Sequence, residues 1–232
     1  MSTWWCRLPA LVVFVVASAL SVAQTSLLPA NPIATYGFYD GTGGISASIV
    51  GVSGQPFTQA IRITSTRDGS AIWNTQVTWT NTAAVKKGDM LQFAFSIRKL
   101  SPLNGSGVRG MFVAEDAGTP YDKSISAGFP ADSTTWRRYS YAFKSIKDYA
   151  VGQLGFRFQL ARGPQTFEMG GFSALNHGTK ASHLVEQAYY YPGQDASAPW
   201  RAAADQRIEQ HRKGQLTVKV VDRDGRPMEG AT

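Results

Sequence analysis

The chain has 232 residues, of which 43% are hydrophobic and 17% are charged, so it can fill a packed core and is not a disordered polypeptide. Its 23 Lys and Arg outnumber its 16 Asp and Glu, which gives a formal net charge of +7. The single cysteine, Cys6, cannot close a disulfide within the chain, which excludes a disulfide-stapled scaffold and a cysteine zinc knuckle. The length fits one ordinary domain with an appendage.

The first 23 residues have the pattern of a secretory signal peptide. One positive charge, Arg7, precedes the apolar run of residues 8–20, and the small residues Ser21 and Ala23 supply a cleavage site. This apolar run is shorter than the roughly 20 residues that a membrane-spanning helix needs. We therefore expect cleavage before Gln24, secretion to the periplasm or the extracellular space, and no membrane attachment afterwards.

The excess of positive charge does not indicate a nucleic-acid partner. The basic residues are spread along the chain, and their one dense group is formed by Arg201, Arg207, Arg212 and Lys213. No zinc-ligand spacing, helix-turn-helix pattern or RNA-binding aromatic motif accompanies this group. We expect no nucleic-acid partner, and we expect a monomer.

Residues 24–178 are predicted to form one all-β domain. In residues 90–100, Leu91, Phe93, Phe95 and Ile97 alternate with more polar residues, which is the pattern of a half-buried strand. Turn-forming clusters of Gly, Asn, Asp, Pro and Ser separate the strands. The pattern favours a jelly-roll β-sandwich of two antiparallel sheets. The other predicted strands cover residues 45–50, 60–65, 75–80, 108–114, 137–143, 153–161 and 166–175.

The composition changes after residue 178. Residues 179–214 are predicted to be a linker with a helix at about 199–213, because Ser197 can cap its start, Pro199 fits its first turn and Gly214 can end it. Residues 215–232 begin with an alternating strand and a turn, as in a β-hairpin. A lone hairpin is marginal in water, so we expect the chain to be cut off inside a further domain.

No catalytic constellation is recognisable in the sequence. The histidines His177, His183 and His211 have neither the spacing of a zinc pair nor a neighbouring nucleophile motif. Glu115 and Asp116 are adjacent and point to opposite sides of a strand, whereas glycoside hydrolysis needs two carboxylates that face each other across a substrate. We expect no catalytic residue and no activity from this chain alone.

Strand alternation predicts a polar binding face instead. If Phe156 and Phe158 point inward, Arg157 and Gln159 point outward, and planar amides and guanidiniums are suited to vicinal sugar hydroxyls. Phe112 lies between small residues, so we expect its ring to be accessible for stacking on a sugar. An alternative interpretation makes these residues ordinary solvated surface and Trp73 part of the core. The candidate binding residues from this argument are Trp73, Gln76, Gln92, Phe112, Tyr121, Arg157 and Gln159.

Several short motifs follow one another along the predicted β domain: residues 73–76 (WNTQ), 85–98, 135–139 (TWRRY), 153–158 (QLGFRF) and 165–168 (QTFE). Their order resembles that in the carbohydrate-binding modules of families 4 and 9, also called CenC-like modules. The resemblance covers residues 36–176 and implies a jelly roll that binds xylan, glucan or cellulose chains.

The C-terminal part contains four recognisable segments: residues 190–204 (YYPGQDASAPWRAAA), 207–214 (RIEQHRKG), 216–222 (LTVKVVD) and 225–227 (GRP). Together they resemble the segment that precedes the catalytic barrel in secreted endo-1,4-β-xylanases of glycoside hydrolase family 10. This resemblance implies that the chain is the N-terminal part of such an enzyme and lacks the barrel with its two catalytic glutamates. A similar hairpin opens Ig-like modules of other secreted proteins, so that alternative stays open.

The family resemblance also assigns roles to single residues. It implies that Trp73 and Gln76 are a cleft aromatic residue and its polar neighbour, and more loosely that Phe112 and Glu115 are a second such pair. Related modules often carry an aspartate near a structural calcium where this chain has Gly170. We therefore predict no cofactor and leave calcium open.

Together, these observations predict a secreted, non-catalytic module that binds polysaccharide, either xylan or β-glucan, for a xylan-degrading enzyme whose catalytic domain is missing here. The alternative is a structural β-sandwich that packs against a neighbouring catalytic or Ig-like domain. The prediction requires Gln92, Phe112 and Arg157 to border one common concavity. Their placement on separate sides of the molecule would contradict it.

Overall fold

The computed structural model describes residues 24–102, 109–129, 132–188, 199–212, 214 and 220–228. The described residues fall into two units, divided between residues 189 and 190. The signal peptide predicted for residues 1–23 lies outside the described residues. Within the described ranges, no helix is both long enough and apolar enough to cross a membrane.

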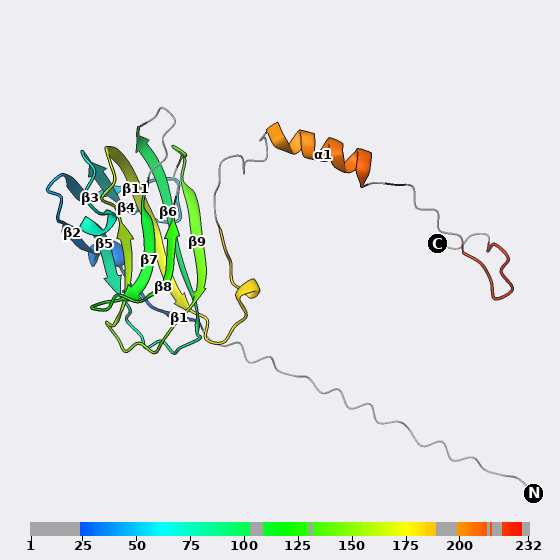
Figure 1. Ribbon diagram of the computed structural model, residues 1–232, viewed down its shortest axis with the longest axis horizontal. Helices are drawn as coiled ribbons and strands as arrows, with labels where there is room; N and C mark the ends of the chain where they lie inside the picture. The colour runs from blue at the N-terminus through cyan, green and yellow to red at the C-terminus, as the bar shows by residue number, and fades with distance from the viewer. Residues whose placement is uncertain are drawn as a thin grey trace, which may run out of the picture. The chain divides into compact units, whose positions relative to one another are not determined.

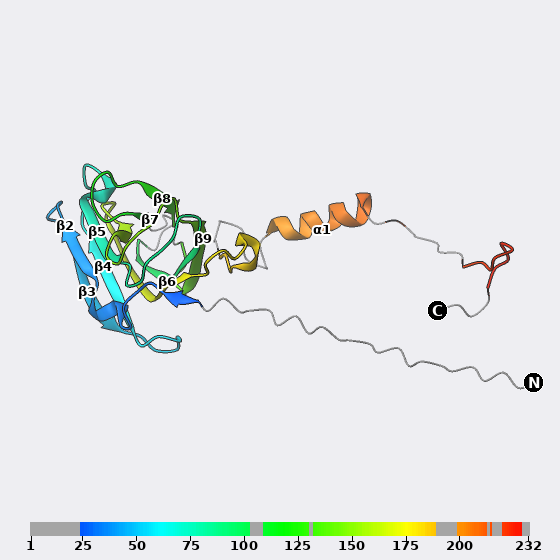
Figure 2. The same cartoon turned by 90° about the horizontal axis from the view of Figure 1, so that it is seen from below.

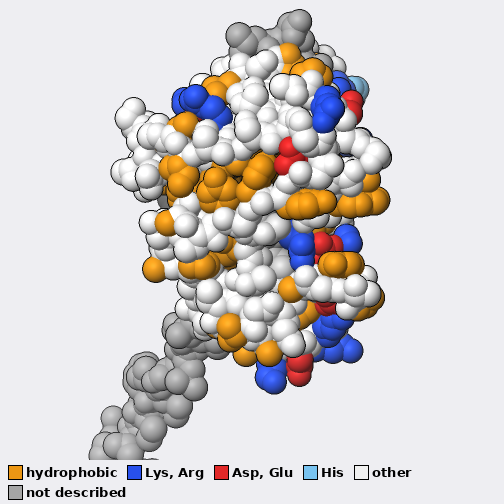
Figure 3. Space-filling view, turned by 90° about the vertical axis from the view of Figure 1, so that its left-hand side faces the viewer, with side chains coloured by type: hydrophobic (Ala, Val, Ile, Leu, Met, Phe, Trp, Pro, Cys, Tyr) orange, Lys and Arg blue, Asp and Glu red, His pale blue; other side chains and the backbone are white. Residues whose placement is uncertain are grey.

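The first unit consists of two antiparallel β-sheets packed face to face (Figures 1 and 2). Figure 3 shows one side of its surface, on which hydrophobic side chains lie among charged and other polar groups. Sheet A has the strand order β3 (Ile45–Gly51), β4 (Gln59–Ser65), β11 (Gln165–Asn176), β6 (Met90–Ser101), β9 (Arg137–Lys144), and the short β1 (Thr25–Ser26) also pairs with β11. Sheet B has the order β2 (Gly37–Asp40), β5 (Thr75–Thr80), β10 (Leu154–Gln159), β7 (Met111–Asp116), β8 (Lys123–Gly128).

The connections give this sandwich its jelly-roll topology, as predicted. Among the described strands, β3 is followed by β4 and β7 by β8 in the same sheet, while every other connection crosses to the opposite sheet. Three short 3₁₀ helices lie in the connections: η1 (Pro32–Ala34), η2 (Ile72–Asn74) and η3 (Ser182–Leu184). The sheets meet through inward side chains of β6 and β10, because strand alternation turns the phenylalanines of both strands to the same interior.

The core contains the phenylalanines that strand alternation assigned to it. Phe93, Phe95, Phe156 and Phe158 are at most 1% exposed. Across the two sheets, the ring centroids of Phe93 and Phe156 are 5.4 Å apart, and those of Phe95 and Phe158 are 4.8 Å apart. Burying each such side chain contributes about 1.5–3 kcal/mol. These rings therefore fix the two sheets against each other, and the opposite face of β10 is left for a site.

The strands that have a clear hydrophobic alternation were predicted within a few residues of their ends. The expected strand at residues 108–114 is β7, which begins at Met111. Strands β1, β2 and β8 were not predicted. The first two are only two and four residues long, and β8 has the polar sequence KSISAG at a sheet edge. Short and polar edge strands leave little periodic signal.

The second unit contains α1 (Pro199–His211), which lies at the predicted position. Its apolar residues Trp200 and Ile208 are 47% and 39% exposed. The predicted turn after Val221 is present, since Val221 pairs with Pro227 and Gly225 takes the left-handed φ of 82° that favours glycine. Ser197, the proposed helix cap, and most of the predicted strand at residues 216–221 lie outside the described residues.

Candidate functional site

A cleft of about 600 Å³ lies on the outer face of sheet B, and we call it the sheet B cleft. Strands β2, β5, β10, β7 and β8 supply its floor, and η2 and the loop between β7 and β8 supply its sides. It is lined by Tyr39, Ile72, Trp73, Asn74, Gln76, Met111, Glu115, Tyr121, Lys123, Arg157 and Gln159.

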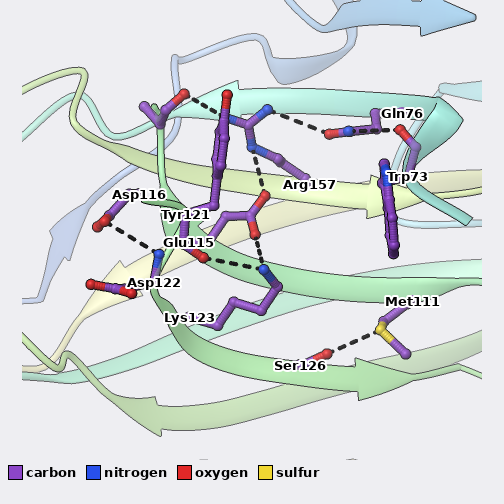
Figure 4. Close-up of polar contacts among 11 residues, drawn as sticks. Trp73, Gln76, Met111, Glu115, Asp116, Tyr121, Asp122, Lys123, Ser126 and Arg157 are labelled. Atoms are coloured by element: carbon purple, nitrogen blue, oxygen red, sulfur yellow. Dashed lines mark hydrogen bonds and ion pairs between the residues drawn. The ribbon is translucent and has the colours of Figure 1, made fainter. Parts of the chain in front are cut away.

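Two aromatic rings stand on either side of the polar centre of the cleft. Trp73 lies in η2 and is 58% exposed, and Tyr121 lies in the loop after β7 and is 46% exposed. Figure 4 shows both rings nearly edge-on, with Arg157 and Glu115 between them. Tyr121 has a φ of 63°, an uncommon conformation for a residue with a side chain. The strained backbone conformation thus occurs at the residue whose ring forms one wall of the cleft.

The polar centre is an ion-paired group of three side chains. Arg157 Nε lies 3.2 Å from Glu115 Oε1, and Lys123 Nζ lies 2.6 Å from Glu115 Oε2. The Arg157 guanidinium also donates to the Ala117 carbonyl at 2.6 Å and lies 5.8 Å from the centre of the Tyr121 ring. Arg157 thus connects the floor of the cleft to the loop that carries one of its walls.

Two glutamines supply amide groups beside the ion pairs. Gln76 donates to the Trp73 carbonyl at 2.9 Å and accepts from Arg157 at 3.4 Å, so it links the other wall to the floor. Gln159 is 5% exposed and lines the floor of the cleft next to Met111, which lies opposite it in the strand register. Its side-chain amide can both donate and accept hydrogen bonds there.

The turn after Tyr39 is organised by one carboxylate. Asp40 accepts hydrogen bonds at 2.6–3.0 Å from the backbone amides of Thr42, Gly44 and Ile45 and from the hydroxyls of Thr42 and Thr75. Burial alone would raise the pKa of Asp40, but these hydrogen bonds outweigh it and hold the pKa far below its usual value. The glycine-rich segment 41–44 is therefore a turn. Asp40, the neighbour of Tyr39, is also tied through Thr75 to the strand that follows Trp73.

The loop that carries Tyr121 is also held from its far side. Lys147 Nζ donates to Asp116 Oδ2 at 2.6 Å and to Asp122 Oδ2 at 3.2 Å, so it joins both ends of the loop. Burial alone would raise the pKa of Asp116, but the bond from Lys147 leads the effects that hold it below its usual value. The same bond raises the pKa of Lys147. Asp116 and Lys147 line a second pocket of about 330 Å³.

Phe112 is not part of the cleft, so the expectation of an accessible ring was wrong. The ring is fully buried, lies opposite Phe158 in the strand register and stacks on Tyr141 with centroids 5.6 Å apart. Its neighbour Met111 lies opposite Gln159 and lines the cleft instead. The parity of β7 is therefore the reverse of the predicted one.

Gln92 also lies away from the cleft, on the outer face of sheet A. It is 7% exposed there, and its amide donates to the Ser140 hydroxyl at 2.8 Å and to the Glu186 carbonyl at 3.0 Å. The segment that follows β11 covers it, since Ala188 pairs with Ser140. The predicted common concavity of Gln92, Phe112 and Arg157 is therefore contradicted, because they lie on one outer face, in the core and on the other outer face.

The structure brings the other six predicted residues together in the sheet B cleft: Trp73, Gln76, Glu115, Tyr121, Arg157 and Gln159. The sequence argument missed Tyr39, Met111 and Lys123. Tyr39 on β2 lies opposite Gln76 on β5. Because paired residues point to the same side of a sheet, the outward direction of Gln76 would have identified Tyr39 if β2 had been predicted. Lys123 lies at the start of β8, which was also not predicted.

The residues present give no indication of a calcium site at Gly170. A side chain there would collide with the Phe57 ring, because an added Cβ would lie 2.7 Å from it. Nor do the described residues contain a cluster of three or more His, Cys, Asp or Glu that could hold a metal ion. Glu115 and Glu168 lie in different sheets, so these two carboxylates cannot face each other across one substrate.

No family model matches the chain, and no curated protein matches it. Solved structures of similar fold include carbohydrate-binding modules. A structure titled "CBM4 structure and function" is 14% identical, with 61% of this chain and 94% of that chain covered and a TM-score of 0.47. The CBM22-1 xylan-binding domain of Xyn10C from Paenibacillus barcinonensis is 9% identical, with 62% and 87% covered and a TM-score of 0.43. A sugar-binding protein, named as such only provisionally, from Bacteroides thetaiotaomicron is 8% identical, with 67% and 95% covered and a TM-score of 0.47.

Proposed function

We propose that the sheet B cleft binds a polysaccharide chain and that the protein is a non-catalytic carbohydrate-binding module. The observation that carries the proposal is the pair of exposed rings, Trp73 and Tyr121, on either side of a floor of amide and ion-paired groups. The apolar face of a pyranose packs on an aromatic ring, and a few fixed polar groups then orient its hydroxyls. Gln159 adds an amide on the floor of the cleft that can donate to one sugar hydroxyl and accept from another.

The fixed geometry of the cleft favours binding, because little has to be ordered when a ligand enters. Arg157 is held by Glu115 and by the Ala117 carbonyl, and Gln76 is held by Trp73. Preorganised groups avoid part of the entropic cost of association. The volume of about 600 Å³ is in the usual range for a ligand site, which holds a few sugar units rather than a whole polymer.

The wider role is also a proposal. The signal-like N-terminus and the C-terminal resemblance point to a secreted protein that holds a xylanase-type catalytic domain on plant polysaccharide, with xylan or β-glucan as the ligand. Tethering raises the local substrate concentration even when the module itself binds weakly.

Affinity electrophoresis in gels that contain xylan, β-glucan or mannan tests the binding function. We expect retardation in at least one gel, and we expect Trp73→Ala or Tyr121→Ala to weaken the affinity about tenfold, since a lost aromatic contact costs about 0.5–1.5 kcal/mol beyond its buried area. Trp200→Ala is the matched control, because Trp200 is a similarly exposed tryptophan in the other unit.

The alternative, a purely structural sandwich, makes the opposite prediction. If the folded chain is not retarded by any of the three polysaccharides, the binding proposal is wrong and the structural role is favoured. Sugar release by the isolated chain would instead show an enzyme. In that case, the loss of activity in Glu115→Gln would place the reaction in the sheet B cleft.

A further inference from the structure

The sheet B cleft carries more positive than negative charge. Its lining contains one acidic residue, Glu115, and two basic residues, Lys123 and Arg157. The Glu115 side chain is 5% exposed, and each of its carboxylate oxygens lies within 3.2 Å of one of the two cations. The carboxylate is therefore neutralised within the group, and one positive charge remains in excess.

The accessible part of this excess charge is the ammonium group of Lys123. The Arg157 side chain is only 17% exposed, and its guanidinium is directed at Glu115, Gln76 and Ala117. The Lys123 side chain is 40% exposed. Its ammonium has three N–H groups and contacts the Glu115 carboxylate and the Tyr121 carbonyl, so it retains a donor for a ligand.

We propose that the sheet B cleft prefers polysaccharide chains that carry carboxylate groups, as uronic acid residues do, and that Lys123 contacts the carboxylate. This inference rests on the proposed function and adds the class of glycan to it. A neutral chain would partly desolvate the excess charge without supplying a counter-charge, whereas a carboxylate would supply one. A phosphate or sulfate ester fits less well, because the fork of Arg157 that would bind it in bidentate fashion is already occupied.

The test compares one polymer in two charge states. Glucuronoxylan and the same glucuronoxylan after chemical reduction of its carboxyl groups to alcohols differ in charge but not in backbone. For the whole chain, we expect about threefold to fivefold tighter binding to the charged form at low salt, the size of an exposed ion pair. We expect this preference to disappear in about 1 M NaCl, where the screening length is near 3 Å.

Charge variants of the cleft assign the effect to Lys123. Lys123→Gln should bind the two polymers with nearly equal affinity, and Lys123→Arg should keep the preference for the charged polymer. Glu115→Gln raises the excess charge and should strengthen the preference. Lys144→Gln is the matched control, because it removes an equal charge from an exposed lysine on β9 of the other sheet.

The outcomes separate this inference from the proposed function. Equal binding of both polymers by the unchanged chain would overturn the charge preference and leave carbohydrate binding intact. A preference that persists in Lys123→Gln but falls in Lys144→Gln would show attraction by the overall positive charge and would overturn the role of Lys123. No binding to either polymer, together with none in the other gels, would overturn both proposals.

Discussion

The ammonium of Lys147 lies 2.6 Å from Asp116 Oδ2, and this contact holds the back of the loop whose front presents Tyr121 to the cleft. Lys147 follows β9 and is not among the residues that line the sheet B cleft. Arg157 holds the same loop from the cleft side through the Ala117 carbonyl. The position of one aromatic wall is therefore set by two cations on opposite sides of a short loop.

Lys147→Met should weaken glycan binding although Lys147 lies outside the cleft. Without its ammonium, the two aspartates at the ends of the loop repel each other, and Tyr121 loses its fixed position. We expect the dissociation constant measured by calorimetry to rise about fivefold, the lower end of usual coupling between sites. Hydrogen exchange of the Tyr121 and Asp122 backbone amides, which donate to Gly118 and Asp116, should become faster in the free protein.

Two further variants distinguish positioning from a general loss of structure. Lys147→Arg should restore most of the affinity, because it keeps the positive charge. In a Tyr121→Ala background, Lys147→Met should cost no additional affinity, since the ring that it positions is gone. Additive losses in the double variant would contradict the role of Lys147.

Phe112→Ala should reduce stability and not glycan recognition. The ring is fully buried between Phe93 and Tyr141, so the substitution leaves a cavity that typically costs about 3–5 kcal/mol. Urea denaturation measures this loss. The neighbour Met111 is partly exposed in the cleft, and Met111→Ala should show the reverse, with a smaller change in stability and a measurable change in affinity. A loss of affinity without a loss of stability in Phe112→Ala would contradict its place in the core.

His177 should make the fold less stable in mild acid. Its Nε2 lies 3.1 Å from the Gln92 carbonyl oxygen and donates to it, because the Gln92 amide nitrogen donates elsewhere, and the buried Nδ1 has no partner among the described residues. Burial, followed by the charge of Lys180, lowers the pKa of His177 below its usual 6.5. The folded state therefore resists protonation while the unfolded state accepts a proton.

The sign of the pH effect follows from this difference. The contribution of neutral His177 to the free energy of unfolding is fully present above the pKa of about 6.5 that histidine has in the unfolded chain. It is lost as the pH falls below that value, by no more than about 1.4 kcal/mol per pH unit. Urea midpoints between pH 8 and pH 5 measure the loss. His177→Asn should make the urea midpoint depend less on pH in this range. His183→Asn, at an exposed position in η3, should leave the pH dependence of the midpoint unchanged. Equal slopes in all three proteins would exclude His177 as the cause.

Glu168→Gln should destabilise the sandwich without affecting the cleft. The carboxylate is fully buried on the outer face of sheet A and lies 2.6 Å from Arg62 and 2.7 Å from Arg98. Because both arginines are partly exposed, we expect a loss of about 2–3 kcal/mol, below that for a wholly buried pair. Glu186→Gln is the matched control, since its exposed pair with Arg138, 3.6 Å apart, is worth less than about 1 kcal/mol. Thermal unfolding and calorimetric glycan affinity, measured on the same samples, test both halves of the prediction.

Strand alternation was enough to identify the core and much of the cleft. The phenylalanines of β6 and β10 alternate with polar residues, so their burial and the outward direction of Arg157 and Gln159 followed from the sequence. Two positions show where this argument stops. In β7, the run of residues 111–114 (MFVA) is apolar on both sides, and only the pairing of Phe112 with Phe158 decides which side faces the core.

Gln92 shows a second limit of the sequence argument. Alternation directs its side chain outward, but the outer faces of the two sheets point in opposite directions, and the sheet to which a strand belongs depends on long-range pairing. The later segment that covers Gln92 is distant in the chain and carries no periodic signal of its own. Lys123 was missed for a related reason, because a short polar edge strand resembles a loop in the sequence.

The carboxylate of Asp40 has a consequence for the environments in which the cleft keeps its shape. Its partners are backbone amides and hydroxyls, which carry no net charge, so dissolved ions hardly weaken these contacts. The turn beside Tyr39 should therefore persist in seawater or brine. Discrimination between charged and neutral glycans should fade there, and what remains would be recognition by shape and ring stacking.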